Sequence, residues 1–245
     1  MKKMLASKIN ERVKLLKENL KDILIDANFS ELERGVELLI SCLKQYVEEF
    51  HEIPGHELEH TFRVLELSLF LGKVCNADLR VLIYASLLHD IGRFLKSKLD
   101  HAKLSADIAR KLLKNHFPDE FINKVIVCIR EHSYSEKKKP SSLESAILQD
   151  ADRLDALGAI GIARVFSYGG YLGRPIYEMG RDIGEGGSVG HFYDKILKLH
   201  ELMNTEIAKV IAKERTEFIK KFLERLKKEV KSEDVKQIMT HMHMP

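Results

Sequence analysis

The residues of this chain that are best suited to chemistry are two histidines and two aspartates. His60 comes first, the adjacent pair His89-Asp90 follows, and Asp152 comes last. The pair directly follows the apolar run 81–88, where neither an imidazole nor a carboxylate is easily buried without a partner. Two imidazoles and two carboxylates together form a mixed nitrogen and oxygen site for one divalent transition metal. Such a site predicts hydrolysis by metal-activated water.

Three longer motifs surround these residues. They are His60-Thr61-Phe62-Arg63-Val64, Leu87-Leu88-His89-Asp90-Ile91-Gly92-Arg93 and Asp150-Ala151-Asp152-Arg153-Leu154-Asp155-Ala156. With these motifs the chain resembles the HD-domain superfamily of metal-dependent phosphohydrolases over roughly residues 57 to 215. The segments Gly173-Arg174-Pro175 and Met203-Asn204-Thr205 resemble a branch that includes nucleotide pyrophosphohydrolases.

The resemblance implies a ligand set for one divalent ion: Mn, Co, Ni, Fe, Zn or Mg. The ligands implied are His60, His89, Asp90 and Asp152. In the last motif the family pattern selects Asp152 over Asp150 and Asp155. Asp155 is three residues further along the same helix face, so it is a candidate to orient a histidine or a water. For Asp150 we expect a solvated or capping carboxylate.

Cationic side chains near these ligands suit a phosphorylated substrate. Arg63 follows His60 by three residues and shares its helix face, and Arg93 follows the His-Asp pair within one turn. A guanidinium binds phosphate in a bidentate manner, so we expect Arg63, with Arg93 as a second candidate, to balance phosphate charge. We expect Lys96 and Lys98 to be solvated.

Two further histidines and one glutamate complete the candidate catalytic set. In binuclear relatives, histidines near the positions of His101 and His132 hold a second metal, whereas in mononuclear relatives they face substrate phosphate. We favour substrate contact, and two surface histidines at helix ends remain the alternative. Nucleotidase-like relatives carry a glutamate where this chain has Arg93, which leaves Glu131, beside His132, as the first candidate for a general base.

One motif is misleading. Residues 56–60 match the metalloprotease pattern H-E-x-x-H. That chemistry requires both histidines on one continuous helix face, but Pro54-Gly55 immediately precedes His56, and the downstream histidine motif is missing. We therefore reject the protease interpretation.

Composition is typical of an ordinary globular protein. Hydrophobic residues make up 44% of the 245 residues and charged residues 31%, with a formal net charge of +3. This charge is too small to favour nucleic-acid binding. Three scattered cysteines without a C-x-x-C pair are typical of reduced thiols, and no apolar run approaches a membrane span. We expect a cytoplasmic protein without a membrane or nucleic-acid partner, and the sequence leaves its oligomeric state open.

Helical periodicity dominates the chain and predicts an all-α, single-domain HD core. We expect an N-terminal helical pair within residues 1–52, the core in residues 53–215, and a C-terminal helix and tail in residues 216–245. Residues 143–166 are apolar on nearly all sides, which predicts one long central helix. We expect a further helix over residues 192–211 and a last one through residues 218–226.

Residues 169–190 contain eight of the 14 glycines and few aliphatic side chains. A loop of this length is usually functional, so we predict a lid beside the metal cleft, with Arg174 or Tyr171 near the outer end of the substrate. A surface excursion is the alternative, and a short hairpin within the loop is compatible with the sequence.

These expectations combine into one function: hydrolysis of a phosphorylated small molecule, with a nucleotide as the best candidate, by metal-activated water held at Asp90 and its fellow ligands. A phosphodiesterase or alarmone hydrolase of the same superfamily is the nearest alternative. A metal-bound sensor module with little turnover is an alternative of another class.

Overall fold

The computed structural model describes residues 2–22, 24–45, 53–55, 57–95, 100–133 and 138–242. Within these ranges the chain is helical and contains no β-strand, which confirms the all-α prediction. Among the described helices, none combines the length and apolarity needed to cross a membrane. The helices are α1 Lys2–Leu20, α2 Asp26–Gln45, α3 Leu58–Cys75, α4 Leu79–Leu88, η1 Ile91–Phe94, α5 His101–Leu113, α6 Asp119–Glu131, α7 Leu143–Asp155, α8 Gly158–Tyr171, α9 Gly187–Asp194, η3 Ile196–Leu202, α10 Glu206–Val230 and α11 Glu233–His241.

By its internal contacts the chain divides into two compact units. The first comprises Met1–Asp155 with Met203–Ala208, and the second comprises Ala156–Leu202 with Lys209–Pro245. The expected division at residues 52 and 215 stays a prediction.

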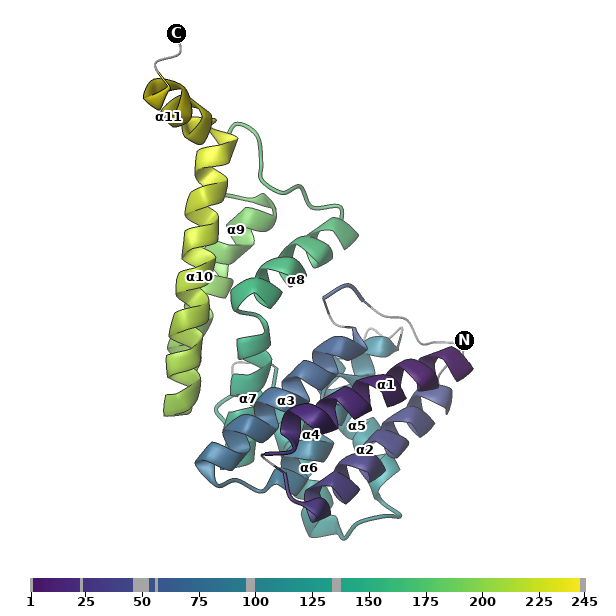
Figure 1. The fold of residues 1–245 in the computed structure, drawn as a ribbon. Helices are drawn as coiled ribbons and strands as arrows, with labels where there is room; N and C mark the ends of the chain where they lie inside the picture. Colours follow the sequence, from purple (N-terminus) through teal and green to yellow (C-terminus); the bar gives the residue numbers. More distant parts are fainter. Residues whose placement is uncertain are drawn as a thin grey trace. The chain divides into compact units, whose positions relative to one another are not determined.

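The first unit is built around α4, whose residues 81–88 are all buried. Helices α2, α3, α6 and α7 contact α4, and α5 packs against α6 and η1 (Figure 1). In the N-terminal pair, α1 contacts α2 and α3, and α2 contacts α4. At Gly35 of α2 an added Cβ would lie 2.8 Å from Cδ1 of Leu87, so the glycine lets α2 approach α4 closely.

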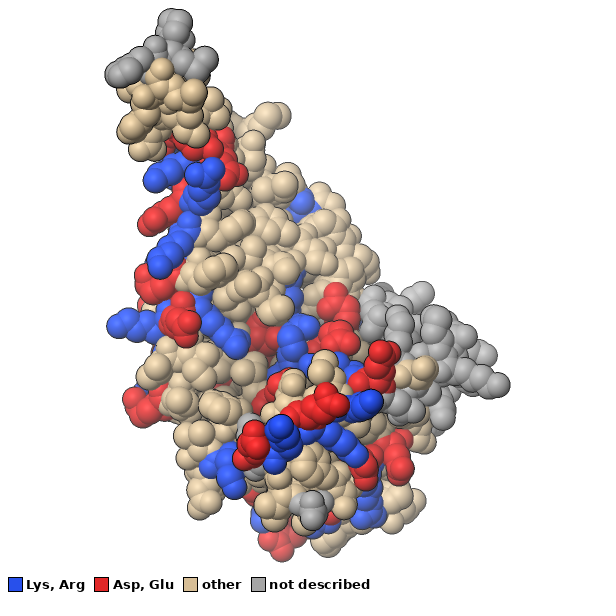
Figure 2. All heavy atoms as spheres, viewed as in Figure 1, with Lys and Arg blue, Asp and Glu red and all other residues tan. Residues whose placement is uncertain are grey.

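Charged side chains cover the N-terminal helices with mixed signs (Figure 2). Ion pairs join Arg12 to Glu59 and Lys17 to Glu33. Basic and acidic groups therefore alternate on the described part of that face, and neither sign forms an extended patch there.

The prediction of one long helix over residues 143–166 is wrong. Helix α7 ends at Asp155, Leu157 is extended, and Gly158 has a φ of 68°. This left-handed backbone is readily adopted by glycine and stops the first helix before α8 begins. Apolarity alone could not reveal the break, because both helices bury apolar residues.

The second unit joins α8, α9 and α10 through an aromatic cluster. The ring centroids of Phe166, Phe192 and Phe222 lie 5.8–6.5 Å apart. Instead of the two expected helices over residues 192–211 and 218–226, the chain forms α9, η3 and one continuous α10.

The glycine-rich loop is shorter than expected, because α8 and α9 take up its ends and leave residues 172–186 as the irregular part. No hairpin forms there. Instead, the N–H groups of Ser188 and Val189 donate to the carbonyls of Pro175 and Ile176 and close the loop.

Candidate metal centre

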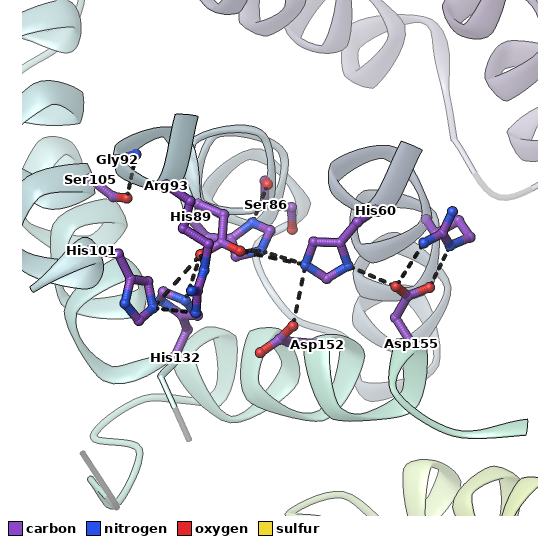
Figure 3. A network of polar contacts seen from close by, with 12 residues as sticks. His60, Ser86, His89, Gly92, Arg93, His101, Ser105, His132, Asp152 and Asp155 are labelled. Carbon is purple, nitrogen blue, oxygen red and sulfur yellow. Dashed lines mark hydrogen bonds and ion pairs between the residues drawn. The ribbon is translucent and has the colours of Figure 1, made fainter. Parts of the chain in front are cut away.

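Three segments of the first unit bring the four predicted ligands together. His60 lies in the first turn of α3, His89 follows the last residue of α4, Asp90 precedes η1, and Asp152 lies in the last turn of α7. His60, His89 and Asp90 are buried, whereas the Asp152 side chain is 23% exposed. His60, His89 and Asp152 converge (Figure 3). The cluster is therefore a largely buried set of ligand atoms that is partly open to solvent at Asp152.

The spacing of the donor atoms suits one divalent ion. Nε2 of His60 lies 3.4 Å from Nε2 of His89 and 3.5 Å from Oδ1 of Asp152. Oδ2 of Asp90 lies 3.7 Å from Nε2 of His60 and 3.8 Å from Nε2 of His89. Two ligands held about 2.1 Å from one ion at tetrahedral or octahedral angles lie about 3.0–3.4 Å apart. A small contraction of the cluster would thus bring these atoms to coordination distance.

Hydrogen bonds on the far side of each ring direct the histidines inward. Nδ1 of His89 donates to the carbonyl of Ser86 at 2.8 Å, and Nδ1 of His132 lies 2.7 Å from the carbonyl of Ile129. A carbonyl only accepts, so Nδ1 carries the hydrogen and Nε2 of neutral His89 presents its lone pair to the cluster. Burial lowers the pKa of His89 to about 4, which keeps the ring neutral near pH 7. Neutral imidazoles of fixed tautomer together with carboxylates are the donors that a divalent ion requires.

Asp155 holds His60 from behind. Its Oδ2 lies 2.7 Å from Nδ1 of His60, while Arg63 donates to both of its oxygens, at 2.6 and 3.1 Å. Asp155 thus orients a histidine, as its spacing from Asp152 suggests. Burial lowers the pKa of Arg63, but the hydrogen bonds and charge of Asp155 raise it overall. This pairing directs one edge of the Arg63 guanidinium to Asp155, where phosphate contact was expected.

Arg93, His101 and His132 gather at the other oxygen of Asp90. Nε of Arg93 donates to Oδ1 of Asp90 at 2.8 Å, and Nη2 of Arg93 donates to Nε2 of His101 at 2.8 Å. Nε2 of His132 lies 3.4 Å from the same oxygen. Burial, followed by the charge of Arg93, lowers the pKa of His101 to about 4. All three side chains thus belong to the cluster, and neither histidine is a remote surface residue.

Gly92 allows this arrangement by close backbone approach. Its N–H donates to Oγ of Ser105 at 2.9 Å, and a Cβ at this position would lie 2.8 Å from the carbonyl oxygen of His101. The glycine therefore lets η1, which carries Arg93, rest directly on the start of α5, which carries His101.

Two acidic residues near the motifs have structural partners instead of cluster contacts. The carboxylate of Glu131 accepts hydrogen bonds from Ser141 N–H and Ser145 Oγ, at 2.9 and 2.5 Å. The structure thus ties this candidate base to the start of α7. Asp150 is fully buried and accepts from Asn204 and Thr205 just before α10, so it caps this segment and is not solvated.

A basic pocket that the sequence did not reveal lies in the same unit. Its volume is about 290 Å³, and Asp100, Lys103, Arg130 and Lys138 line it. Asp100 directly precedes His101, and Arg130 precedes His132 by two residues, so short chain segments connect the pocket to the cluster. Nζ of Lys138 donates to the carbonyl of Arg130 at 3.2 Å. The nearness of Lys103 and Arg130 to His101 and His132 in the sequence could have indicated this pocket. Each cation taken alone, however, has the sequence context of an ordinary solvated side chain.

The remaining candidate residues belong to the second unit or fall outside the described residues. Tyr171 ends α8 and stacks on Tyr168, and Arg174 donates its N–H to the carbonyl of Gly169. Both belong to the second unit, so their approach to the substrate stays a prediction. His56, Lys96 and Lys98 fall outside the described residues; α3 begins at Leu58.

Known proteins that are similar to this chain identify the family to which the cluster belongs. The HD domain family model matches residues 58–157, which include all four candidate ligands. The uncharacterized protein YpgQ of Bacillus subtilis is 35% identical over 185 residues, covering 73% of this chain and 86% of the relative. The chain belongs to the HD-domain family.

Solved HD-domain structures share the fold. An HD-superfamily hydrolase from Bacillus thuringiensis is 32% identical, with a TM-score of 0.65 over 83% of this chain and 98% of that one. The crystal structure of Bacillus subtilis YpgQ in complex with ADP is 31% identical, with a TM-score of 0.63 over 81% of this chain and 96% of that one. The chain therefore has the fold of HD-superfamily hydrolases, with its His-Asp cluster inside the HD domain.

Proposed function

We propose that this protein is a metal-dependent phosphohydrolase that acts on a phosphorylated small molecule, with a nucleotide as substrate. The convergence of His60, His89, Asp90 and Asp152 within one buried cluster carries the proposal. The relationship to HD-superfamily hydrolases supports the reaction class. The ADP complex of the relative YpgQ supports a nucleotide.

The ion would supply an activated water and polarise a phosphoryl oxygen when bound. The protein contributes rigid positioning, because Asp155 and the Ser86 carbonyl fix the two ligand imidazoles. The partly open side at Asp152 is where a reacting phosphoryl group would enter. Arg93 and His132, held at Asp90, are the groups we assign to substrate phosphate. Arg63 contributes by holding Asp155, which in turn orients His60.

The basic pocket gives a place for further substrate charge. Among the described residues that line it, Lys103, Arg130 and Lys138 are cationic and come from α5, α6 and the segment before α7. The carboxylate among these described lining residues, Asp100, accepts the N–H of Lys103 and caps α5. We assign Lys103, Arg130 and Lys138 to the non-reacting phosphates of a nucleoside diphosphate or triphosphate.

The test is a hydrolysis screen with metal-free protein reconstituted with Mn²⁺, Co²⁺, Ni²⁺ or Mg²⁺. Substrates should include nucleoside mono-, di- and triphosphates, cyclic and linear phosphodiesters, and simple phosphomonoesters. We expect turnover of nucleotides that chelation abolishes and that Asp90→Ala removes. Glu120→Ala, which removes an exposed carboxylate of α6, serves as the matched control and should retain activity.

The same screen separates the alternatives. Preferential cleavage of phosphodiesters would favour a phosphodiesterase. Tight metal binding without turnover of any phosphorylated compound would contradict the proposal and favour a sensor module.

A further inference from the structure

The carboxylate of Asp90 divides its oxygens between two sets of partners. Oδ2 faces the first set, Nε2 of His60 and His89, at 3.7 and 3.8 Å. Oδ1 faces the second set: Nε of Arg93 at 2.8 Å, Nε2 of His132 at 3.4 Å and Nε2 of His101 at 3.8 Å. Each oxygen of the carboxylate can therefore bind a different cation, one on the side of His60 and His89 and one on the side of His101 and His132.

The second set has the composition of a metal site. Two imidazole nitrogens and a carboxylate oxygen are donors that divalent transition metals accept. Oδ1 of Asp90 lies 3.4 Å from Nε2 of His132 and 3.8 Å from Nε2 of His101, and the rings of the two histidines lie edge to face at 5.5 Å. Figure 3 shows Arg93, His101 and His132 gathered at the end of the cluster away from Asp155. The guanidinium of Arg93, however, already occupies hydrogen-bonding positions on two of these three groups, Asp90 and His101.

The guanidinium uses the same lone pairs that an ion would need. Nε of Arg93 donates to Oδ1 of Asp90, and Nη2 of Arg93 lies 2.8 Å from Nε2 of His101. Arginine cannot accept a hydrogen bond, so Nε2 of His101 must accept this one with its lone pair. A divalent ion at this position would have to break both contacts.

Charge balance also favours a single ion. One divalent ion and Arg93 face the two carboxylates Asp90 and Asp152, which leaves a single excess positive charge for an anionic substrate. A second divalent ion beside Arg93 would raise this excess to three charges in a largely buried site, where unpaired charge is strongly unfavourable.

We propose that Arg93 is a built-in cation that occupies the place of a second divalent ion, so that the centre is mononuclear. The inference rests on the proposed metal at His60, His89, Asp90 and Asp152. It assigns His101, His132 and Oδ1 of Asp90 to a latent second metal site that the guanidinium blocks.

The experiment measures the number of Mn²⁺ ions bound per chain by calorimetric titration of metal-free protein. We expect one ion for the wild type and two for Arg93→Gln and Arg93→Met, which lack the cation. Arg93→Lys keeps the charge and should bind one. The double variant Arg93→Gln/His101→Ala should return to one, because it loses a ligand of the latent site. Arg110→Gln, a change in an exposed arginine of α5, is the matched control and should bind one.

Electron paramagnetic resonance gives an independent readout, because two Mn²⁺ ions that share the Asp90 carboxylate show spin coupling. Two ions per wild-type chain would overturn the inference even if no variant folded. One ion in wild type and in both folded variants would overturn the role of Arg93 while leaving the proposed metal intact. A wild-type chain that binds no ion would contradict the metal itself.

Discussion

Asp155 accepts a hydrogen bond from His60 while Arg63 holds both of its carboxylate oxygens. His60 and Arg63 lie three positions apart on α3. Asp155 lies three positions after the candidate ligand Asp152 on α7. The packing of α3 on α7 therefore places one ligand and fixes the orientation of another through a single contact surface.

This arrangement predicts that Asp155→Asn weakens the metal site without removing a ligand. An amide in place of the carboxylate is a weaker acceptor for Nδ1 of His60 and loses the ion pair with Arg63, so metal affinity should fall by about 10- to 100-fold. Calorimetric titration of Mn²⁺ measures this, with Glu120→Ala as the control. Unchanged affinity in a folded variant would show that Asp155 does not position His60.

A second prediction concerns Gly92. Alanine there would bring Cβ to 2.8 Å from the His101 carbonyl and 2.9 Å from Ser105 N, both backbone atoms that cannot easily move. We expect a loss of about 1–3 kcal/mol in the free energy of unfolding, together with lower turnover, because η1 must shift away from α5.

Gly170→Ala is the matched control for this change. Apart from its chain neighbours and the local helix backbone, no heavy atom lies within 4 Å of the Cβ added at Gly170, and the residue is helical, so alanine should be neutral or stabilise by up to about 1 kcal/mol. Denaturant unfolding measures both variants, and equal stability of the two would contradict the close approach at Gly92.

The basic pocket gives a third prediction. Lys138→Ala and Lys103→Ala should each raise KM for a nucleoside triphosphate by about three- to tenfold, the equivalent of about 1 kcal/mol for a partly exposed charge contact. Metal affinity and kcat should remain close to wild type, since Lys138 binds the carbonyl of Arg130 and neither lysine is a candidate metal ligand. A phosphomonoester without further phosphates should show no such change. If both substrates lose affinity equally, the pocket does not bind the non-reacting phosphates.

A fourth prediction concerns the loop of residues 172–186. Gly180 has a φ of 82° with open space around it, and Met179 is 93% exposed, so the exposed residues 179–181 can be replaced by glycines with little effect on packing. If the loop covers bound substrate, kcat/KM should fall while metal stoichiometry and melting temperature stay near the parent values. Unchanged kinetics would reduce the loop to a surface excursion.

The sequence predicted the helical class from its periodicity, and it pointed to the four candidate ligands through the resemblance of their motifs to the HD superfamily. Apolar periodicity marks helices, and a three-residue spacing places Asp155 on the face of Asp152. The role of Asp155 could therefore be anticipated before its partner was known.

Other features depend on contacts between segments that sequence spacing does not connect. Glu131 looked like a candidate base beside His132, yet its carboxylate binds Ser141 and Ser145. The sequence placed Arg93 near substrate phosphate, but its bridge from Asp90 to His101 depends on the close backbone approach at Gly92, which spacing along the chain does not reveal. The break between α7 and α8 depends on one glycine within an apolar stretch.

The most direct test of the central claim is an anomalous diffraction map from crystals of the protein soaked in Mn²⁺. We predict one strong peak within about 2.0–2.3 Å of Nε2 of His60, Nε2 of His89 and carboxylate oxygens of Asp90 and Asp152. No peak at these four residues, or a peak held by other side chains, would contradict the account.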